Sequence, residues 1–520
     1  MATQVEARIE DRIAREGVKH FINGQFVESD HGETFETVNP ATNEPIARVA
    51  AGGKAEIDAA VAAARAAFDR GPWRRMPVKE RARALRRIAD LIDKHTDEIS
   101  YLETLDTGLA LAQTRKAQVP RAADNFRFFA EMATKLYDGE TYPVDREYFN
   151  FTTRRPVGVA GLITPWNTPF MLETWKVAPC LAAGDTCIMK PSKWSPLSAH
   201  KLAEVIREAD LPPGVFNLVQ GSGSAAGTPL VEHPEVQLIS FTGSTETGQE
   251  IIGRGAPTLK RFSMELGGKS PTVVFADADL DRALDAAIFG IFSLNGERCT
   301  AGSRLLLEDA IYDQFVARLI RRVERIKVGD PHDLATEVGP LIHREHLAKV
   351  MGYIDIGHEE GATVAAGGTS PDDPALARGN YVRPTVLLDV RPDMRVAQEE
   401  IFGPVLTVMR FRDEAEALRI ANGTRYGLAA YLWTGDITRA HRFAPEIESG
   451  MIWVNSQNVR HLPTPFGGMK WSGIGREGGH YSFEFYCETK NICIAVGQPH
   501  IPQMGLHDEE AEARAAGSDA

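Results

Sequence analysis

Cysteine is scarce in this sequence, and the few cysteines that occur are not paired. The chain has 5 cysteines in 520 residues, with no CxxC spacing and no HExxH pattern among its 14 histidines. Closely spaced cysteines and histidines are typical of zinc sites and disulfide frameworks, so the sequence predicts neither, and we assign no metal site. Four of the cysteines are expected to be buried packing residues, namely Cys180, Cys187, Cys487 and Cys493.

Long hydrophobic runs and an excess of positive charge are also missing. No apolar run is long enough to span a bilayer and no stretch has the pattern of a signal peptide, so we expect a cytoplasmic protein without a membrane partner. The formal net charge of -13 argues against nucleic acid as a partner, but it still allows a local basic pocket for an anionic substrate. A chain of 520 residues is too long for one ordinary core, so we expect two or more domains.

Amphipathic patterns predict several helices before residue 140. The charged residues 1–19 allow either a short helix over residues 5–15 or a frayed terminus, and we favour the frayed terminus. A strand-and-turn segment follows, with Asn23-Gly24 at the turn. Apolar residues recur at helical spacing in the segments expected to form the next helices, which are residues 54–69, 78–95, 96–107 and 121–135.

Strands and helices alternate from residue 157 onward. The expected strands are residues 157–163, 186–189, 215–219 and 236–241, with helices at 170–182 and 197–209. A second alternation follows Lys269, with strands at 272–275 and 303–307 and helices at 281–292 and 311–325. Such alternation predicts parallel sheets covered on both faces, and the first of them is a Rossmann-like dinucleotide unit. We place a domain boundary near Gly267-Gly268.

Two short stretches carry the candidate chemistry. The stretch NGERCTAG, residues 295–302, places Cys299 in a glycine-flanked loop after a mixed apolar run. A lone cysteine is more often a buried packing residue, but a thiolate in an open loop is a strong nucleophile. The stretch MELGGKSP, residues 264–271, places Glu265 at the end of an apolar run before two glycines. A carboxylate beside a thioester could activate water, so the pair indicates covalent catalysis.

These two stretches resemble the nucleophile and general-base signatures of the aldehyde dehydrogenase superfamily, and the similarity extends from about Phe21 to Val496. The resemblance implies an α/β fold with a Rossmann-type cofactor domain, an α/β catalytic domain and a small β oligomerisation extension. The domains expected from it are residues 1–139 with 158–266 for NAD(P) binding, 267–480 for catalysis, 140–157 with 481–497 for oligomerisation strands, and a disordered tail at 498–520. It also implies a homodimer or homotetramer.

The resemblance implies oxidation of an aldehyde to a carboxylic acid. Cys299 would attack the carbonyl, and its backbone amide and the Asn167 side chain would hold the oxyanion, although asparagine before Pro169 is equally a turn former. Glu265 would then activate the hydrolytic water. Lys176 and Glu477 match a pair that relays protons near the base, or they form an ordinary ion pair.

Cofactor residues are implied in the same way, with NAD as the first choice and NADP as the alternative. The glycine-rich turn 243–248 follows a strand and opens a helix, which suits a pyrophosphate, although it lacks the GxGxxG spacing and could be a simple tight turn. Lys193 occupies a position where NAD-preferring relatives carry glutamate, and a cation there would tolerate the phosphate of NADP. The full expected set is Ile163, Thr164, Trp166, Lys190, Ser192, Lys193, Gly243, Ser244, Glu400 and Phe402.

The expected substrate is a small, carboxylated aldehyde. The segments ETWKVAPCLA (173–182) and GREGGHYSFE (475–484) resemble the branch of the superfamily that oxidises muconate-type semialdehydes, which implies 5-carboxymethyl-2-hydroxymuconate semialdehyde in aromatic-compound breakdown. Arg121 and Arg460 match positions that bind the substrate carboxylate in that branch, although a single arginine is usually a surface charge. Alternatives are 2-hydroxymuconate or 2-aminomuconate semialdehyde, betaine aldehyde, a general aldehyde, acyl transfer to coenzyme A, and a non-enzymatic structural role.

Overall fold

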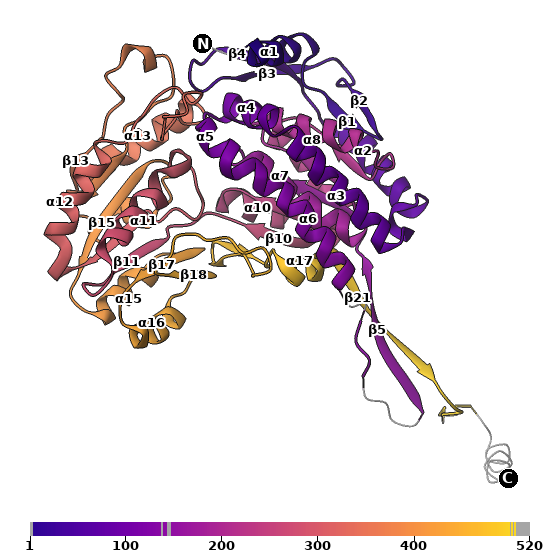
Figure 1. Ribbon diagram of the computed structural model, residues 1–520. Helices are drawn as coiled ribbons and strands as arrows, with labels where there is room; N and C mark the ends of the chain where they lie inside the picture. The colour runs from indigo at the N-terminus through magenta and orange to yellow at the C-terminus, as the bar shows by residue number, and fades with distance from the viewer. Residues whose placement is uncertain (1–3, 137–138, 143–146, 500, 503, 506–520) are drawn as a thin grey trace. The chain divides into compact units, whose positions relative to one another are not determined.

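The structure is a computed structural model that describes residues 4–136, 139–142, 147–499, 501–502 and 504–505 (Figure 1). The chain divides into two compact units, one of residues 1–135 and 156–486 and the other of residues 136–155 and 487–520. The tail predicted at 498–520 lies mostly outside the described residues. In the described part of the chain, no helix is long and apolar enough to cross a membrane.

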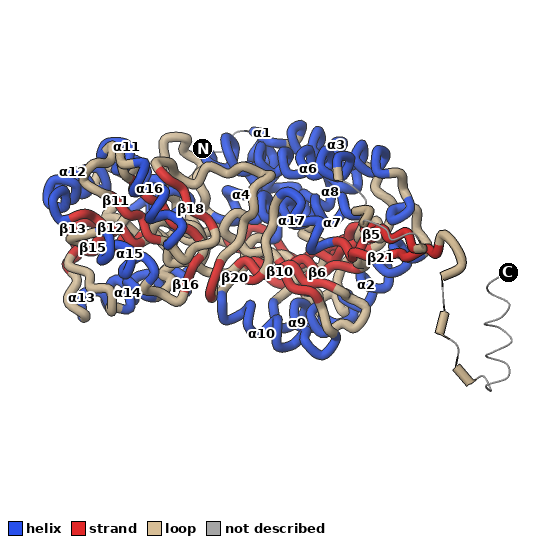
Figure 2. The backbone as a smooth tube through the Cα atoms, turned by 90° about the horizontal axis from the view of Figure 1, so that it is seen from below, coloured by secondary structure: helices blue, strands red, loops and turns tan. Residues whose placement is uncertain are grey.

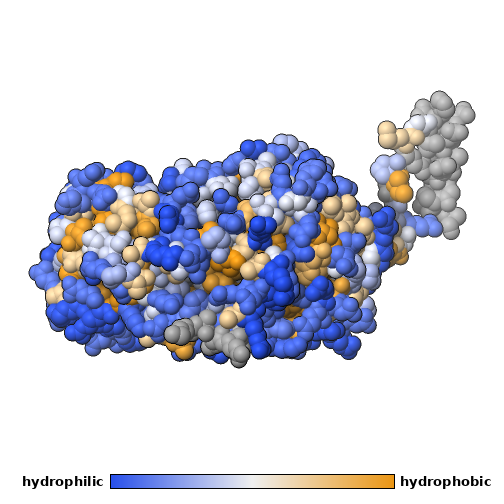
Figure 3. All heavy atoms as spheres, turned by 90° about the horizontal axis from the view of Figure 1, so that it is seen from above, coloured by the Kyte–Doolittle hydropathy of each residue, from blue (hydrophilic) through white to orange (hydrophobic). Residues whose placement is uncertain are grey.

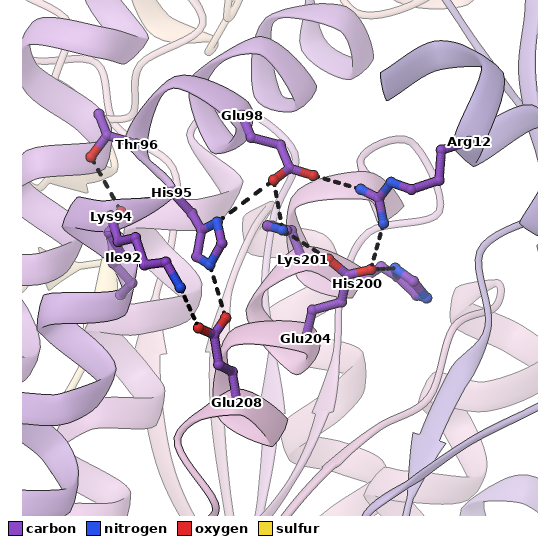
Figure 4. Close-up of polar contacts among 10 residues, drawn as sticks. All are labelled: Arg12, Ile92, Lys94, His95, Thr96, Glu98, His200, Lys201, Glu204 and Glu208. Carbon is purple, nitrogen blue, oxygen red and sulfur yellow. Dashed lines mark hydrogen bonds and ion pairs between the residues drawn. The ribbon is translucent and has the colours of Figure 1, made fainter. Parts of the chain in front are cut away.

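The first helix corrects the preference for a frayed terminus. Helix α1 spans Gln4–Glu16, and Ile13 is buried in a small core with Val49 and Leu102. Arg12 donates to Glu98 at 2.6 Å and to Glu204 at 2.9 Å, and Figure 4 shows these two carboxylates reaching the guanidinium together. The Lys201 Nζ lies 2.8 Å from a Glu98 carboxylate oxygen and 2.9 Å from a Glu204 carboxylate oxygen. The helix is therefore held by tertiary packing and ion pairs that no local sequence pattern reveals.

The other predicted N-terminal elements are confirmed. Helices α2 Lys54–Asp69 and α4 Thr96–Thr107 have the expected bounds, α3 ends one residue early as Val78–Lys94, and α6 begins two residues early as Val119–Lys135. The short helix α5 Leu111–Gln113 precedes α6. Asn23 and Gly24 both have positive φ, at 50° and 80°, which forms the tight turn between the first two strands. Strands β3 Thr34–Val38 and β4 Pro45–Ala50 form a separate antiparallel pair.

The first large sheet has the Rossmann strand order. Its eight strands run β2-β1-β8-β7-β6-β9-β10-β20, and the central five are parallel in the order third, second, first, fourth, fifth. The strands are β1 His20–Ile22, β2 Gln25–Val27, β6 Val159–Ile163, β7 Thr186–Lys190, β8 Phe216–Leu218, β9 Leu238–Thr242, β10 Arg261–Glu265 and β20 Gly473–Ile474. The predicted Rossmann-like unit is confirmed, and its topological switch point lies between β6 and β9.

Helices cover both faces of this sheet, as alternation along the chain predicts. Figure 2 shows α3, α6, α7 and α8 on one side of the strands and α2, α9 and α10 on the other. The further helices are α7 Pro169–Ala183, α8 Pro196–Glu208, α9 Thr228–Glu232, α10 Thr245–Gly255 and α17 Gly479–Tyr486. Because both faces are covered, each residue of β6, β7, β8 and β9 is buried.

The second large sheet is also mainly parallel, in the order β13-β14-β15-β12-β11-β17-β18. Its strands are β11 Pro271–Val274, β12 Arg304–Glu308, β13 Thr363–Ala366, β14 Thr385–Leu388, β15 Val405–Phe411, β17 Ala429–Trp433 and β18 Met451–Val454. Helices α11 Leu280–Phe292 and α12 Tyr312–Val323 pack on one face. The helices on the other face are α13 Arg344–Glu359, α14 Arg395–Gln398, α15 Glu414–Asn422 and α16 Ile437–Phe443.

The two sheets meet at opposite strand ends. At the carboxyl edge of the first sheet, Lys190 is the last residue of β7 and Glu265 is the last residue of β10. Asn167 follows the end of β6 at the same edge. Cys299 and Glu400 precede strands β12 and β15 of the second sheet, at its amino edge. Strands β16 Tyr426–Gly427 and β19 Met469–Lys470 form a small pair that leads into β20. The chemistry-bearing residues of both sheets are therefore brought to one boundary.

The second unit holds a two-stranded sheet of β5 Tyr148–Pro156 and β21 Cys487–Ala495. Residues 481–486, expected as strand, instead belong to helix α17. Cys493 is exposed on β21, so the prediction that it is buried was wrong, whereas Cys180, Cys187 and Cys487 are buried. An isolated two-stranded sheet leaves side chains exposed to solvent, which a count of apolar residues does not reveal.

The face of the molecule in Figure 3 is mostly hydrophilic, with hydrophobic residues in small separate groups.

Candidate active site

The loop that carries Cys299 is fixed by backbone constraints. Helix α11 ends at Phe292, and the next turn contains two non-glycine residues in left-handed conformation, Leu294 and Asn295. The Asn295 side-chain amide donates to the carbonyls of Gly108 and Pro340 at 3.2 and 3.0 Å. These bonds satisfy the buried amide and stabilise a backbone conformation that local sequence disfavours. The loop therefore presents Cys299 from a rigid support.

Glycines bring the loop of Glu265 against the loop of Cys299. A Cβ on Gly268 would lie 2.6 Å from the Cys299 carbonyl oxygen, and one on Gly467 would lie 2.9 Å from a Glu265 carboxylate oxygen. Both approaches are closer than real Cβ contacts allow, so these positions require glycine. Gly268 thus lets the loop of Glu265 pack against the Cys299 backbone, and Gly467 leaves space for the Glu265 carboxylate.

Glu265 is a buried carboxyl group with an unusual environment. Its side chain closes β10 and the residue is 4% exposed, and neither carboxylate oxygen has a hydrogen-bond partner among the described residues. Burial, with a smaller effect from the charge of Glu477, raises the pKa of Glu265 well above its usual range, while Lys176 and Arg460 oppose that shift. A carboxylate with a raised pKa and free oxygens is suited to accept a proton from water.

The Cys299 thiol is also strongly perturbed. Burial raises its pKa to about 12, and the nearby carboxylates of Glu400 and Glu265 act in the same direction, whereas Arg298 opposes them. The resting side chain is therefore a thiol at neutral pH, and it must lose a proton as it attacks. The Asn167 amide lies in the same cavity, where its Nδ2 donates to the Glu297 carbonyl at 2.8 Å.

Lys176 and Glu477 form a buried pair, not a surface one. The Lys176 Nζ lies 2.9 Å from a Glu477 oxygen and also donates to the Ser240 hydroxyl at 2.8 Å. The hydroxyl in turn donates to Glu477 at 3.2 Å, and the exposed side-chain fractions are 0% for the lysine and 8% for the glutamate. Because the charge of Glu477 raises the pKa of Glu265, this triad acts electrostatically on the candidate base.

A cavity of about 290 Å³ opens beside Cys299. Arg121 and Arg460 line it together with Asn167, so the structure brings both expected substrate residues to the expected nucleophile. The Arg460 guanidinium carbon lies 3.6 Å from the centre of the Phe466 ring and 4.6 Å from that of Trp175, and the Arg121 guanidinium carbon lies 5.7 Å from the latter. Both guanidinium groups thus lie beside the ring of Trp175.

The charged side chains that line this cavity are all positive. In the described part of the chain, no acidic side chain lines it, and neither Arg121 nor Arg460 forms an ion pair. Burial lowers the pKa of Arg121 to about 10 and that of Arg460 to about 9, and the charge of Arg121 adds to the second shift. Both side chains are partly buried, and the carboxylates that act on them, Asp124 on Arg121 and Glu265 and Glu477 on Arg460, do not line the cavity. Two desolvated cations of this kind are costly unless an anion joins them. The cavity is therefore built for a negatively charged ligand.

Several cavity residues were missed in the sequence. Met171 and Trp175 lie one helical turn apart on α7 and both line the cavity, but that helix is almost entirely buried, so its spacing cannot separate lining from core. Arg298 also lines it and precedes the nucleophile directly. An arginine beside a candidate nucleophile is the signal that would have found it.

A second cavity, of about 310 Å³, lies at the carboxyl edge of the first sheet. Ile163 and Lys190 line it, as do glycines of the GSGSAAG segment, residues 221–227, which the sequence reading passed over. The Lys190 Nζ donates to the Pro191 carbonyl at 2.8 Å, and burial lowers its pKa to about 8. The Thr164 hydroxyl is buried without a partner among the described residues. A glycine-lined cavity at the switch point, with the buried Lys190 in its lining, fits a dinucleotide.

The turn at Gly243 differs from expectation in one respect. The Gly243 amide donates to the Glu265 carbonyl at 3.1 Å, so it is not free to bind a phosphate. Its lack of a side chain has another cause, because a Cβ would lie 2.3 Å from the Phe241 ring. Ser244 caps helix α10 by accepting from the Thr247 amide at 3.2 Å, which leaves the start of the helix ordered for an anion.

Glu400 contacts the loop that follows Glu265, and Phe402 contacts Trp166. One Glu400 oxygen accepts from the Gly268 amide at 2.8 Å, and burial raises its pKa to about 7. Phe402 has a φ of 63°, and its ring meets that of Trp166 edge-on at 5.3 Å. Both residues therefore occupy defined positions beside the Cys299 loop, and neither is an ordinary surface group.

Ser192 and Lys193 do not line the 310 Å³ cavity at the carboxyl edge of the first sheet. The Ser192 hydroxyl accepts from the Trp194 amide at 3.2 Å, a local turn bond. The exposed Lys193 ammonium lies 4.4 Å from the centre of the Trp194 ring and lines a different cavity, of about 590 Å³, with Ser222. Its charge nevertheless lowers the pKa of Lys190. The lysine is thus near the dinucleotide cavity but not within it.

Comparison with known proteins agrees with this geometry. The model of the aldehyde dehydrogenase family matches residues 26–492. The chain is 54% identical over 470 residues to 5-carboxymethyl-2-hydroxymuconate semialdehyde dehydrogenase of Escherichia coli, covering 89% of this chain and 98% of that protein. It is 47% identical over 485 residues to 2-hydroxymuconic semialdehyde dehydrogenase of Pseudomonas sp. strain CF600, covering 92% and 99%. The solved structure of PnpE in complex with nicotinamide adenine dinucleotide has a TM-score of 0.91 and 44% identity, covering 93% of this chain and 99% of that one.

Proposed function

Because the chain belongs to the aldehyde dehydrogenase family and is an NAD(P)-dependent aldehyde dehydrogenase, we propose that it oxidises a carboxylated semialdehyde, 5-carboxymethyl-2-hydroxymuconate semialdehyde, to the corresponding acid. The observation that carries this proposal is the pair of partly buried arginines, Arg121 and Arg460, which line the cavity of Cys299 and form no ion pair among the described residues. A planar guanidinium binds both oxygens of a carboxylate, so the pair would hold the far end of a flat, conjugated chain.

In the proposed mechanism, the Cys299 thiol gives its proton to solvent water in the cavity, and its sulfur attacks the aldehyde carbon so that the carbonyl oxygen becomes an oxyanion. The Asn167 side-chain amide and the Cys299 backbone amide stabilise that charge. NAD bound in the first sheet's cavity would supply the hydride acceptor for the aldehyde carbon. Residues that would hold the cofactor are Ile163, Thr164, Trp166, Lys190, Glu400 and Phe402, with Ser192, Lys193, Gly243 and Ser244 nearby. The result of this half-reaction is a thioester on Cys299.

Hydrolysis of the thioester is assigned to Glu265. Its carboxylate accepts a proton from water, and the hydroxide attacks the acyl carbon and releases Cys299 with the acid product. The buried chain of Lys176, Ser240 and Glu477 offers an adjoining route for that proton, supported by hydrogen bonds of 2.8 to 3.2 Å. A base poised for water argues against transfer of the acyl group to coenzyme A.

The alternative substrates differ in charge. Betaine aldehyde carries a quaternary ammonium, and the cationic cavity would repel it instead of binding it. A neutral aldehyde would leave the two arginines unpaired. A purely structural role would not require the constrained Cys299 loop beside an unpaired carboxylate. The carboxylated semialdehydes are therefore the substrates that fit best.

Removing either arginine is expected to separate charged from neutral substrates. Arg460→Gln or Arg121→Gln should lower kcat/KM for the carboxylated semialdehyde by ~10- to 100-fold, because a hydrogen bond to a charged group contributes about 1.5–3 kcal/mol. Hexanal, which lacks the carboxylate, should be oxidised almost as well as by the wild type. Steady-state rates from nicotinamide absorbance measure both, and Arg115→Gln, an exposed arginine paired with Asp97, is the control. Equal losses on both aldehydes, or none, would contradict the assignment.

Lys193 is expected to influence the choice between NAD and NADP. A cation near the ribose would tolerate a 2′-phosphate, so Lys193→Glu should raise the ratio of kcat/KM for NAD to that for NADP by ~10-fold or more, as expected when a charge-assisted contact is replaced by repulsion. Lys79→Glu, another charge reversal at an exposed lysine, should leave that ratio unchanged. An unchanged ratio in Lys193→Glu would mean that its ammonium points away from the cofactor.

We also propose domain roles, a mode of assembly and a compartment. Residues 1–139 with 158–266 would bind the cofactor, and residues 267–480 would carry the nucleophile. The sheet of β5 and β21 exposes Phe149 and Ile494, which supports a role as an edge for subunit contact in a homodimer or homotetramer. The cytoplasm stays the predicted compartment.

A further inference from the structure

A third arginine in the Cys299 cavity has no role in the account above. Arg298 immediately precedes Cys299 and lines the same 290 Å³ cavity. Its Nη1 is buried without a hydrogen-bond partner, and the guanidinium forms no ion pair with any residue in the described ranges. Burial lowers its pKa, and the groups that oppose this shift are Tyr431 and Cys299, not a carboxylate. A partly buried cation with a buried, unused donor, in the lining of a ligand cavity, calls for an anion from the ligand.

Arg298 is a separate cationic point from the pair described above. Its guanidinium carbon lies 5.5 Å from the centre of the Phe289 ring of helix α11, whereas Arg121 and Arg460 share the ring of Trp175 on helix α7. The charge of Arg298 acts on the Cys299 thiol, to which it is adjacent in the chain. The cavity therefore offers one cation beside the reacting atom and a pair of cations on a different wall.

We propose that Arg298 binds a second substrate carboxylate, carried on a short branch next to the aldehyde carbon. This inference rests on the proposed function, in which Arg121 and Arg460 hold the far carboxylate. The names of the two relatives' substrates describe this difference: 2-hydroxymuconic semialdehyde has one carboxylate at the end opposite the aldehyde, and the 5-carboxymethyl compound adds another beside it. Arg298 is then the residue that selects the dicarboxylated aldehyde.

The test uses these two semialdehydes as a matched pair that differs only in the carboxymethyl group. Arg298→Met keeps an unbranched apolar stem and removes the guanidinium and its charge. We expect kcat/KM for 5-carboxymethyl-2-hydroxymuconate semialdehyde to fall by ~10- to 100-fold more than kcat/KM for 2-hydroxymuconate semialdehyde, the range of a lost charge-assisted hydrogen bond. Because both substrates react with the same thiol, any effect of the lost charge on Cys299 cancels in the ratio.

Two further variants make the outcome decisive. Arg298→Lys should recover part of the ratio, since it restores the charge without the planar fork. Arg460→Gln should lower both rates together, because both substrates carry the far carboxylate. Equal losses on the two semialdehydes in Arg298→Met would overturn the inference and leave Arg298 as a residue that acts on the thiol. If wild-type protein instead prefers hexanal to both semialdehydes, the proposed function itself fails.

Discussion

Cys299→Ala protein is expected to reduce no cofactor and to form no acid from any aldehyde, a loss on the order of 10⁴-fold or more in kcat. Every step of the proposed mechanism passes through a bond to the Cys299 sulfur, and no other described cysteine lines the 290 Å³ cavity. The rigid loop and the Asn167 amide stay in place, so the variant should fold and bind cofactor normally. Nicotinamide absorbance and product chromatography measure the two halves of the reaction separately.

The exposed Cys493 supplies a matched control. Cys493→Ala should retain wild-type activity, and iodoacetamide should inactivate it at the same rate as the wild type. Since burial raises the pKa of Cys299 to about 12, inactivation should accelerate steadily with pH up to strongly alkaline solution, as the thiolate fraction grows. Residual turnover by Cys299→Ala at a tenth of the wild-type rate would remove the cysteine from the mechanism.

Glu265→Gln is expected to divide the reaction in two. The variant should complete about one fast turnover per active site and then stop, because formation of the thioester does not need the base whereas its hydrolysis does. Rapid mixing should therefore show a burst of cofactor reduction followed by a slope reduced by ~10²- to 10⁴-fold, the usual contribution of a general base. Steady turnover at the wild-type rate would exclude Glu265 as the base.

The pH dependence of hydrolysis follows from the same residue. A base acts in its deprotonated form, and burial raises the pKa of Glu265 well above its usual range. The hydrolysis rate of the wild type should rise with pH through that raised pKa and then level off. Glu477→Gln removes the negative charge that helps to raise it, so the rise should move to lower pH. A midpoint in the ordinary range for glutamate would contradict the buried setting of this carboxylate.

Local patterns predicted most of the fold because its elements are amphipathic and regularly alternating. Helix α2 was found with its exact bounds, since Ile57, Val61 and Phe68 repeat at helical spacing. Helix α1 was misjudged, because its order depends on Arg12 reaching two distant carboxylates. Cys493 was misjudged because burial on a two-stranded sheet depends on what covers it. Tertiary context decides such cases, and no local window contains it.

The candidate site was predictable where short motifs carry the chemistry. Cys299, Glu265 and Asn167 were named from motifs and the resemblance, and the structure brings all three to one boundary between the sheets. The use of the Gly243 amide by the Glu265 carbonyl was not predictable, because the pairing joins separate strands. The position of Arg298 before the nucleophile was a signal in the sequence, but its lack of a partner is visible only when the whole cavity is assembled. Whether a charged side chain has a partner depends on residues that are distant in the sequence, so a short motif does not show it.

The covalent intermediate on Cys299 is the central claim, and mass spectrometry of Glu265→Gln tests it most directly. The variant is mixed with NAD and 5-carboxymethyl-2-hydroxymuconate semialdehyde, quenched in acid after the burst, and digested. The account predicts that the peptide containing Cys299 gains the mass of the acyl group, that hydroxylamine removes this mass, and that Cys299→Ala shows neither. A completed burst with an unmodified Cys299 peptide would contradict the account.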